Sequence, residues 1–183
     1  GAVALLFVKR LSDPIEAMAT AADGLAKGDV SQQVTHRSED ELGLLADAFR
    51  RLLHALSNKA DVARSIAAGS VDVEVEIASD KDVLGQAMTE MRNNIQALIH
   101  DTKSLADAAQ RGQLDERADA ERHDGEFRSI VEGINATLEA MVRPIRVTAD
   151  HLDRIARGDI PERIEEEYRG EFDAIKRSLN GCI

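Results

Sequence analysis

The chain has 183 residues, of which 43% are hydrophobic but only 3% are aromatic, and it contains no tryptophan. Aliphatic side chains must therefore fill any core, which favours thin helical bundles over a thick α/β core. The formal net charge of -11 is spread along the chain, which argues against binding to nucleic-acid phosphates or to an anionic membrane surface.

The first eight residues, Gly1 to Val8, are uniformly apolar and are followed at once by Lys9 and Arg10. A helix needs about 20 apolar residues to cross a bilayer, so this run is too short to span one. It also lacks the basic segment that opens a signal peptide. We expect residues 1–10 to be the end of a transmembrane helix with a basic cytoplasmic flank. The alternative is an ordinary buried helix start.

The next expected element is a helix that starts near Pro14 and ends at Gly28. Proline is tolerated in the first turn of a helix, where its missing amide proton costs least, and glycine ends helices in a left-handed conformation. A connector follows, with two aliphatic residues, Val30 and Val34, that a purely solvated loop would not need. A second helix is expected from Leu42.

The same order of features recurs three more times along the chain. The helix-ending glycines, 41 to 46 residues apart, are Gly28, Gly69, Gly112 and Gly158. Two residues after each glycine lies a first connector peg, namely Val30, Val71, Leu114 and Ile160. Six residues after each glycine lies a second connector peg, namely Val34, Val75, Ala118 and Ile164. The helix that follows each connector opens at a seam anchor, namely Leu42, Leu84, Phe127 and Phe172. Such a period is typical of a repeat architecture, and we expect the pegs to enter the groove between two parallel helices.

Apolar residues after each seam anchor recur in steps of three and four. The predicted seams are Leu42-Leu45-Phe49-Leu52-Leu56, Leu84-Ala87-Met91-Ile95-Leu98, Phe127-Ile130-Ile134-Leu138-Met141 and Phe172-Ile175-Leu179. This spacing is that of a narrow stripe which buries itself against partner helices. Almost no linker separates the repeats, so the second helix of one repeat is expected to continue as the first helix of the next. Pro144, near the start of the fourth repeat, marks the one junction where a kink is expected.

The repeats are placed at residues 11–57, 58–100, 101–142 and 143–183, and the fourth breaks off within its second helix. A repeat of this size cannot bury much apolar surface alone, whereas two chains side by side supply four helices and a closed core. The predicted fold class is therefore all-α. It consists of consecutive parallel homodimeric four-helix coiled-coil bundles whose helices are joined by extended connectors.

Three motifs of the first repeat, Asp13-Pro14-Ile15, Gly28-Asp29-Val30 and Asp40-Glu41-Leu42-Gly43, resemble the HAMP domain closely. The other repeats depart from them and look like the divergent units of poly-HAMP arrays. The segments 123–138 and 158–180 are similar to the tandem HAMP regions of methyl-accepting chemotaxis receptors.

This resemblance implies a parallel homodimer that carries signals from a transmembrane sensor to an output domain in the same chain. It places the segment on the cytoplasmic side of the cell inner membrane, in contact with a chemotaxis kinase complex through its output domain. It also implies a contact of Glu41 that depends on the signalling state. The pegs, the seam anchors, the helix-ending glycines, Pro14 and Pro144 are the remaining candidate signalling residues.

Two further functions stay open at this stage. The same relay serves sensor histidine kinases and nucleotide cyclases. A static dimeric coiled-coil scaffold is the alternative of another class, although glycines and connectors interrupt the heptad pattern and small residues lie in its seams. Two helix packings of similar energy would fit a relay better than a scaffold.

No enzyme chemistry is expected. The five histidines share no metal-ligand spacing, and Cys182 is the only cysteine. His54 lacks the acidic residue and the proline that follow a phospho-accepting histidine. The glycines end helices singly and form no phosphate loop. We therefore predict no catalytic residue, no cofactor, no metal, no nucleic acid and no small-molecule substrate.

Overall fold

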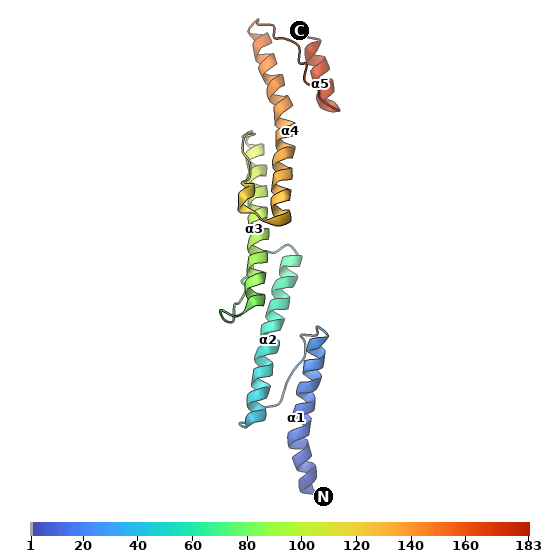
Figure 1. The fold of residues 1–183 in the computed structure, drawn as a ribbon, viewed down its shortest axis with the longest axis vertical. Helices are drawn as coiled ribbons and strands as arrows, with labels where there is room; N and C mark the ends of the chain where they lie inside the picture. The colour runs from blue at the N-terminus through green and yellow to red at the C-terminus, as the bar shows by residue number, and fades with distance from the viewer. Residues whose placement is uncertain (1) are drawn as a thin grey trace. The chain divides into compact units, whose positions relative to one another are not determined.

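The computed structural model describes the backbone of residues 2–183 and the side chains of residues 11–183. The expected end of a transmembrane helix, residues 1–10, lies outside the described side chains. Five α-helices and one 3-10 turn follow one another, and no strand occurs in the described backbone (Figure 1). They are α1 (Ala2–Ala26), α2 (Glu41–Ala67), α3 (Val83–Gln110), η1 (Ala120–Arg122), α4 (Gly125–Ala156) and α5 (Glu171–Asn180). The prediction of an all-α chain is confirmed. None of the helices searched combines the length and the apolarity that crossing a bilayer requires.

The helices gather into two compact units, Gly1–Ile95 and Gln96–Ile183, which are described separately below. The predicted continuity of successive repeats is present in the helices themselves. The expected repeat boundaries near residues 57, 100 and 142 fall inside α2, α3 and α4. The division into four repeats stays a prediction, and repeat 1 to repeat 4 name its parts below.

Each of the first four helices ends at the predicted glycine. Gly28 has a φ of 87°, in the left-handed region, and its amide bonds to the carbonyl of Leu25 at 2.9 Å. The next amide, of Asp29, bonds back to the carbonyl of Gly24 at 2.9 Å. These two bonds form a Schellman motif, which satisfies carbonyls that the helix end leaves free. The same pair of bonds and a positive φ occur at Gly69, Gly112 and Gly158.

Pro14 and Pro144 both lie inside helices, so the expectation that Pro14 opens a helix is wrong. Pro14 lies within α1 and Pro144 within α4. An internal proline removes one backbone hydrogen bond and costs about 3 kcal/mol or more. At Pro144 buried packing helps to offset that cost, because this residue and Val142 are both buried.

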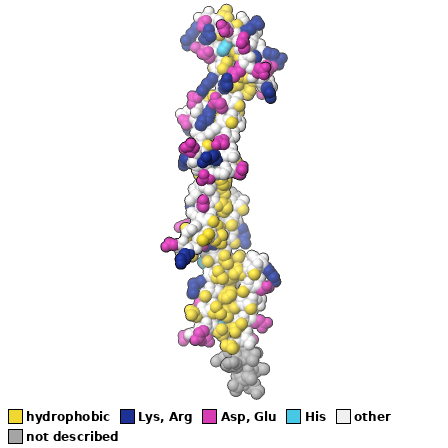
Figure 2. Space-filling model, viewed as in Figure 1, with side chains coloured by type: hydrophobic (Ala, Val, Ile, Leu, Met, Phe, Trp, Pro, Cys, Tyr) yellow, Lys and Arg dark blue, Asp and Glu magenta, His cyan; other side chains and the backbone are white. Residues whose placement is uncertain are grey.

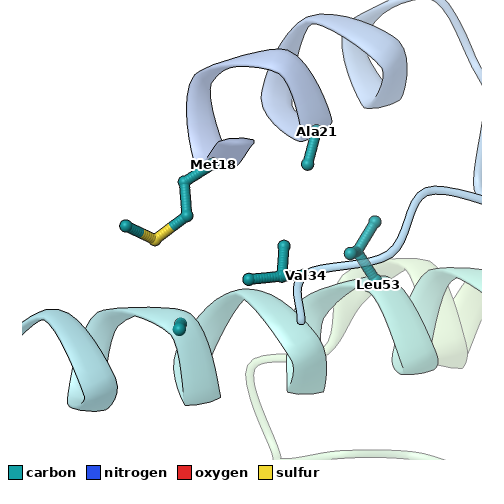
Figure 3. Close-up of a cluster of buried hydrophobic side chains, with 5 residues drawn as sticks. Met18, Ala21, Val34 and Leu53 are labelled. Atoms are coloured by element: carbon teal, nitrogen blue, oxygen red, sulfur yellow. The ribbon is translucent and has the colours of Figure 1, made fainter. Parts of the chain in front are cut away.

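In the N-terminal unit, α1 and α2 run in the same direction and the connector runs back between their ends (Figure 1). Val34 of this connector packs between the two helices. Figure 3 shows its side chain between Met18 and Ala21 of α1 and Leu53 of α2. All four side chains are at most 6% exposed. This is the arrangement that the peg spacing predicts.

The C-terminal unit repeats the plan. Here α4 contacts both η1 and α5. The second peg of repeat 4, Ile164, is buried, as is Leu179 of α5. Two polar side chains, Asp101 of α3 and His123 after η1, are buried as well.

Candidate functional site

The connector pegs differ in how deeply a single chain buries them. The second pegs Val34, Val75 and Ile164 are 4%, 8% and 7% exposed, and Ala118 is half-buried. The first pegs Val30, Val71 and Leu114 are half-buried. Ile160 is 69% exposed, so within one chain it does not enter a groove; the next residue, Pro161, is buried there instead.

One helix position, eight residues after each seam anchor, holds the connector backbone in every repeat. We call the four residues at this position the connector clamps; they are Arg50, Arg92, Asn135 and Asn180. In the N-terminal unit the clamps are arginines. Arg50 donates from Nη1 to the carbonyls of Val34 and His36, at 3.1 and 2.7 Å, and Arg92 donates to the carbonyl of Val73 at 2.9 Å.

In the C-terminal unit the clamps are asparagines that bind both backbone groups of the second peg. Asn135 donates to the carbonyl of Ala118 at 2.8 Å and accepts from its amide at 3.0 Å. Asn180 does the same with Ile164, at 3.1 and 2.8 Å. The side-chain amide therefore imitates a neighbouring strand and satisfies a partly buried backbone.

These four residues could not be predicted from apolar periodicity, because they are polar. A signal was available, since the aligned repeats carry Arg, Arg, Asn and Asn at one fixed distance from the seam anchor. Fixed polar residues that follow a seam at constant distance are a reason to look for a backbone partner.

The helices that follow the first two connectors begin at aspartate caps. Asp40 accepts a hydrogen bond from the amide of Gly43 at 3.0 Å, and the hydroxyl of Ser38 also donates to it. These two bonds, the hydroxyl's first, lower the pKa of Asp40 from its usual value. A β-carbon at Gly43 would lie 1.8 Å from the backbone oxygen of Ser38, so the glycine allows the chain to pass this close. The Asp-x-Leu-Gly motif is thus a cap with a close backbone crossing. Glu41 itself is exposed, and its state-dependent contact stays a prediction.

Asp82 at the start of α3 is held more strongly. Its carboxylate accepts from the amides of Ala78 and Gly85 at 3.0 and 2.9 Å and from the Lys59 ammonium at 2.9 Å. The Ala78 amide, the Lys59 bond and the Gly85 amide, in that order, lower the pKa of Asp82 to about 2. Lys59 belongs to α2, and its side chain is 11% exposed, so this ion pair fastens the start of one helix to the middle of another.

The third connector ends differently, at a buried histidine. His123 Nε2 lies 2.8 Å from Asp101 Oδ2, and its side chain is 1% exposed. Arg122 lies 3.7 Å from the same carboxylate, and Arg128 Nε donates to the His123 carbonyl at 2.9 Å. The cap residue Asp124 makes no side-chain cap bond. Repeat 3 therefore fastens its connector to α3 through a side-chain pair instead of an aspartate cap.

Many seam residues stay exposed in the single chain. Leu42, Phe127 and Phe172 are half-buried, whereas Leu84, the seam anchor of repeat 2, is 49% exposed. Further exposed seam residues are Leu45, Leu52, Met91, Ile130, Met141 and Ile175. Apolar residues on the helices before the glycines, Ile15, Ile145 and Leu152, are exposed too. Figure 2 shows hydrophobic side chains gathered over α1 and α2 on the face in view. The chain also leaves a cavity of about 620 Å³ beside the first connector and one of about 1060 Å³ between α2 and the second connector.

No cluster of three or more His, Cys, Asp or Glu residues suited to a metal occurs among the side chains that the structure describes. The clamp bonds and the His123–Asp101 pair instead join connectors to helices.

Comparison with known proteins places two parts of the chain in one family. HAMP domain models match residues 6–58 and residues 122–183. A putative sensory transducer protein of Acetivibrio thermocellus is 39% identical over 92 residues, which cover 49% of this chain and 16% of that protein. Methyl-accepting chemotaxis protein McpB of Pseudomonas aeruginosa is 25% identical over 168 residues, which cover 86% of this chain and 25% of that protein. The chain thus spans a quarter or less of each of these relatives.

Proposed function

We propose that this chain, which belongs to the HAMP domain family, is the signal-relay segment of a chemoreceptor and works as a parallel homodimer. In this proposal it lies on the cytoplasmic side of the cell inner membrane. It passes a conformational change from a transmembrane sensor to an output domain that acts on a chemotaxis kinase complex. The proposal gives this segment no catalytic role.

The exposed seams are the observation that carries the proposal. Leu45 and Leu52 of α2 are both 45% exposed, while Ala46 and Leu53, one residue further on, are 0% and 6% exposed. α2 therefore has two apolar sides, and a single chain covers only one of them. Covering a half-exposed leucine contributes about 1 kcal/mol, so a second copy along the whole seam is strongly favoured. The heptad spacing suits a parallel helix of the same kind.

A relay also needs packing that can change, and the core supports this. Ala21 and Ala46 lie beside Met18 and Leu53 in one cluster, so small and large side chains share a layer. Such layers pack less uniquely than uniform leucine layers, and two arrangements that differ by helix rotation or tilt become accessible. A static scaffold would have one arrangement only.

Disulfide crosslinking tests the dimer. In a Cys182→Ser background, which removes the exposed native thiol, Leu45→Cys and Leu52→Cys should each crosslink two chains efficiently. Asp47→Cys and Arg51→Cys, exposed on the same helix, are matched controls that should crosslink poorly. A compact monomer by light scattering, or equal crosslinking at all four sites, would refute the parallel dimer.

The relay itself is tested by placing this chain in the Pseudomonas aeruginosa relative in exchange for its matching segment. Crosslinking at residues 45 and 52 should then change when the sensor is stimulated. Crosslinking that ignores the stimulus would favour the scaffold. If this chain relayed the stimulus only when joined to a histidine kinase or nucleotide cyclase output domain, those alternative receptors would be favoured.

A further inference from the structure

We infer that the connector clamps hold the connectors in two ways: the asparagines of the C-terminal unit fix the connector register, and the arginines of the N-terminal unit leave it free to shift. What this inference implies for signalling rests on the proposed relay, but the experiment that tests it does not. It concerns side chains of α2, α3, α4 and α5 that position the connector backbone.

The asparagine clamps bind one connector residue through both of its backbone groups. Asn135 donates to the carbonyl of Ala118 and accepts from its amide, and Asn180 does the same with Ile164. The two clamps select the equivalent residue, six positions after the helix-ending glycine. In extended backbone the next residue presents its groups to the opposite side, so a shift by one residue would break both bonds. A shift by two residues would require the amide and the carbonyl to leave the asparagine and be replaced together. The connector is thereby held in one register.

The arginine clamps bind carbonyls only, because a guanidinium has five donors and no acceptor. Arg50 donates to the carbonyls of Val34 and His36, which lie six and eight positions after the glycine of its repeat. Arg92, at the same helix position, takes the carbonyl four positions after its glycine, that of Val73. Between them the two clamps donate to carbonyls four, six and eight positions after the glycine. A connector under an arginine can therefore move by two residues and find a new carbonyl for the same side chain.

In the proposed relay, the two units would therefore respond differently to a signal. When a signal changes the packing of α1 against α2, the first connector can readjust under Arg50. In the C-terminal unit the connector and the clamping helix move together, because Asn135 and Asn180 couple them. The N-terminal unit would absorb the change and the C-terminal unit would pass it on as a stiffer body.

Amide hydrogen exchange in the 183-residue chain, read residue by residue by NMR, tests this inference. The amides of Ala118 and Ile164 donate to an asparagine, whereas an arginine cannot accept from those of Val34 and Val75. We expect the first two to exchange about fivefold to tenfold more slowly than the second two. Equal rates in the wild-type chain would overturn the inference, without any variant.

Substitutions at one clamp give the second arm. Asn135→Arg should raise the exchange rate of the Ala118 amide about fivefold or more, because the acceptor is lost. Asn135→Asp keeps an acceptor oxygen and should restore slow exchange at Ala118. Ser129→Arg adds the same guanidinium to an exposed site of α4 and should change nothing. An unchanged Ala118 rate in Asn135→Arg would contradict the register assignment. Since exchange is read on the chain itself, it is independent of whether this segment relays a signal.

Discussion

The two units build the same helix–connector–helix plan with different polar groups. In the N-terminal unit, Asp40 and Asp82 cap the helices and Gly43 and Gly85 lie beside the caps. In the C-terminal unit, positive-φ glycines precede the helices or open them, at Gly125 and Gly170, and neutral asparagines hold the connectors. At the helix starts and the clamps, ionic side chains act in the N-terminal unit where glycines and neutral asparagines act in the C-terminal unit. The helix–connector–helix plan thus depends on where the connector is held and not on which side chain holds it.

Substitution of the cap glycine Gly43 should destabilise the N-terminal unit more than any other change considered. Gly43→Ala would place a β-carbon 1.8 Å from the Ser38 oxygen, so the helix start or the connector must move. We expect a loss of about 3 kcal/mol in the unfolding free energy, at the upper end for an overpacked site. Denaturant unfolding at fixed chain concentration measures it.

Gly133→Ala is the matched control in the other unit. Gly133 lies inside α4, and no atom lies within 4 Å of the place of its β-carbon, so alanine should stabilise the helix by about 0.5 to 1 kcal/mol. At the position equivalent to Gly43, repeats 3 and 4 carry Arg128 and Asp173. Gly43→Ala with unchanged stability would show that the cap chemistry of the two units is interchangeable.

The next effect tests the buried pair that only repeat 3 contains. His123→Ala leaves the Asp101 carboxylate, 8% exposed, with Arg122 at 3.7 Å as its remaining neighbour. Leaving a buried acceptor unpaired costs about 2 kcal/mol. His123→Gln keeps a donor and should recover part of this loss. The ring of His36 lies 3.0 Å from a connector hydroxyl in an exposed setting. His36→Ala should therefore lower the unfolding free energy much less in the same experiment. Equal losses at the two histidines would mean that burial of the pair contributes nothing.

Local signals in the sequence were sufficient for the helices and their ends. A Schellman glycine acts within six residues, so Gly28 and Gly158 could be placed from the sequence. The apolar face of each helix could be predicted, but not which of its residues face the same chain and which stay exposed. Heptad spacing selects Leu45 and leaves out Ala46, and only the packed structure shows that Ala46 faces the same chain while Leu45 stays exposed.

Pairings between distant polar residues could not be predicted in this way. Asn135 bonds a residue 17 positions away, and His123 bonds one 22 positions away. No periodicity links such partners, since their approach depends on how the connector folds back. The position of Pro14 was misjudged for a related reason. A motif shows where a helix could begin, and the helical residues upstream decide whether it does.

A smaller effect is expected on acid stability, through the aspartate cap Asp82. The folded chain lowers the pKa of Asp82 from 3.8 to about 2, chiefly through the Ala78 amide and Lys59. A carboxyl group with a lowered pKa stabilises the fold above its unfolded pKa, and this contribution is lost as the pH falls through the folded value. The stabilisation from Asp82 should therefore be complete above about pH 5 and should decline from about pH 4 toward pH 2.

Asp82→Asn removes the charge and should flatten this part of the stability curve, measured by thermal unfolding between pH 2 and pH 6. Asp124→Asn is the control, because the Asp124 side chain is 98% exposed and makes no cap bond. Its pair with Arg128, at 3.7 Å on the surface, is of a kind that contributes little. If the two variants shifted the stability curve equally, the ion pair that fastens α2 to α3 would contribute no more to acid stability than an exposed carboxylate does. If only Asp82→Asn did so, the N-terminal unit would be held by charge at a place where the C-terminal unit is not.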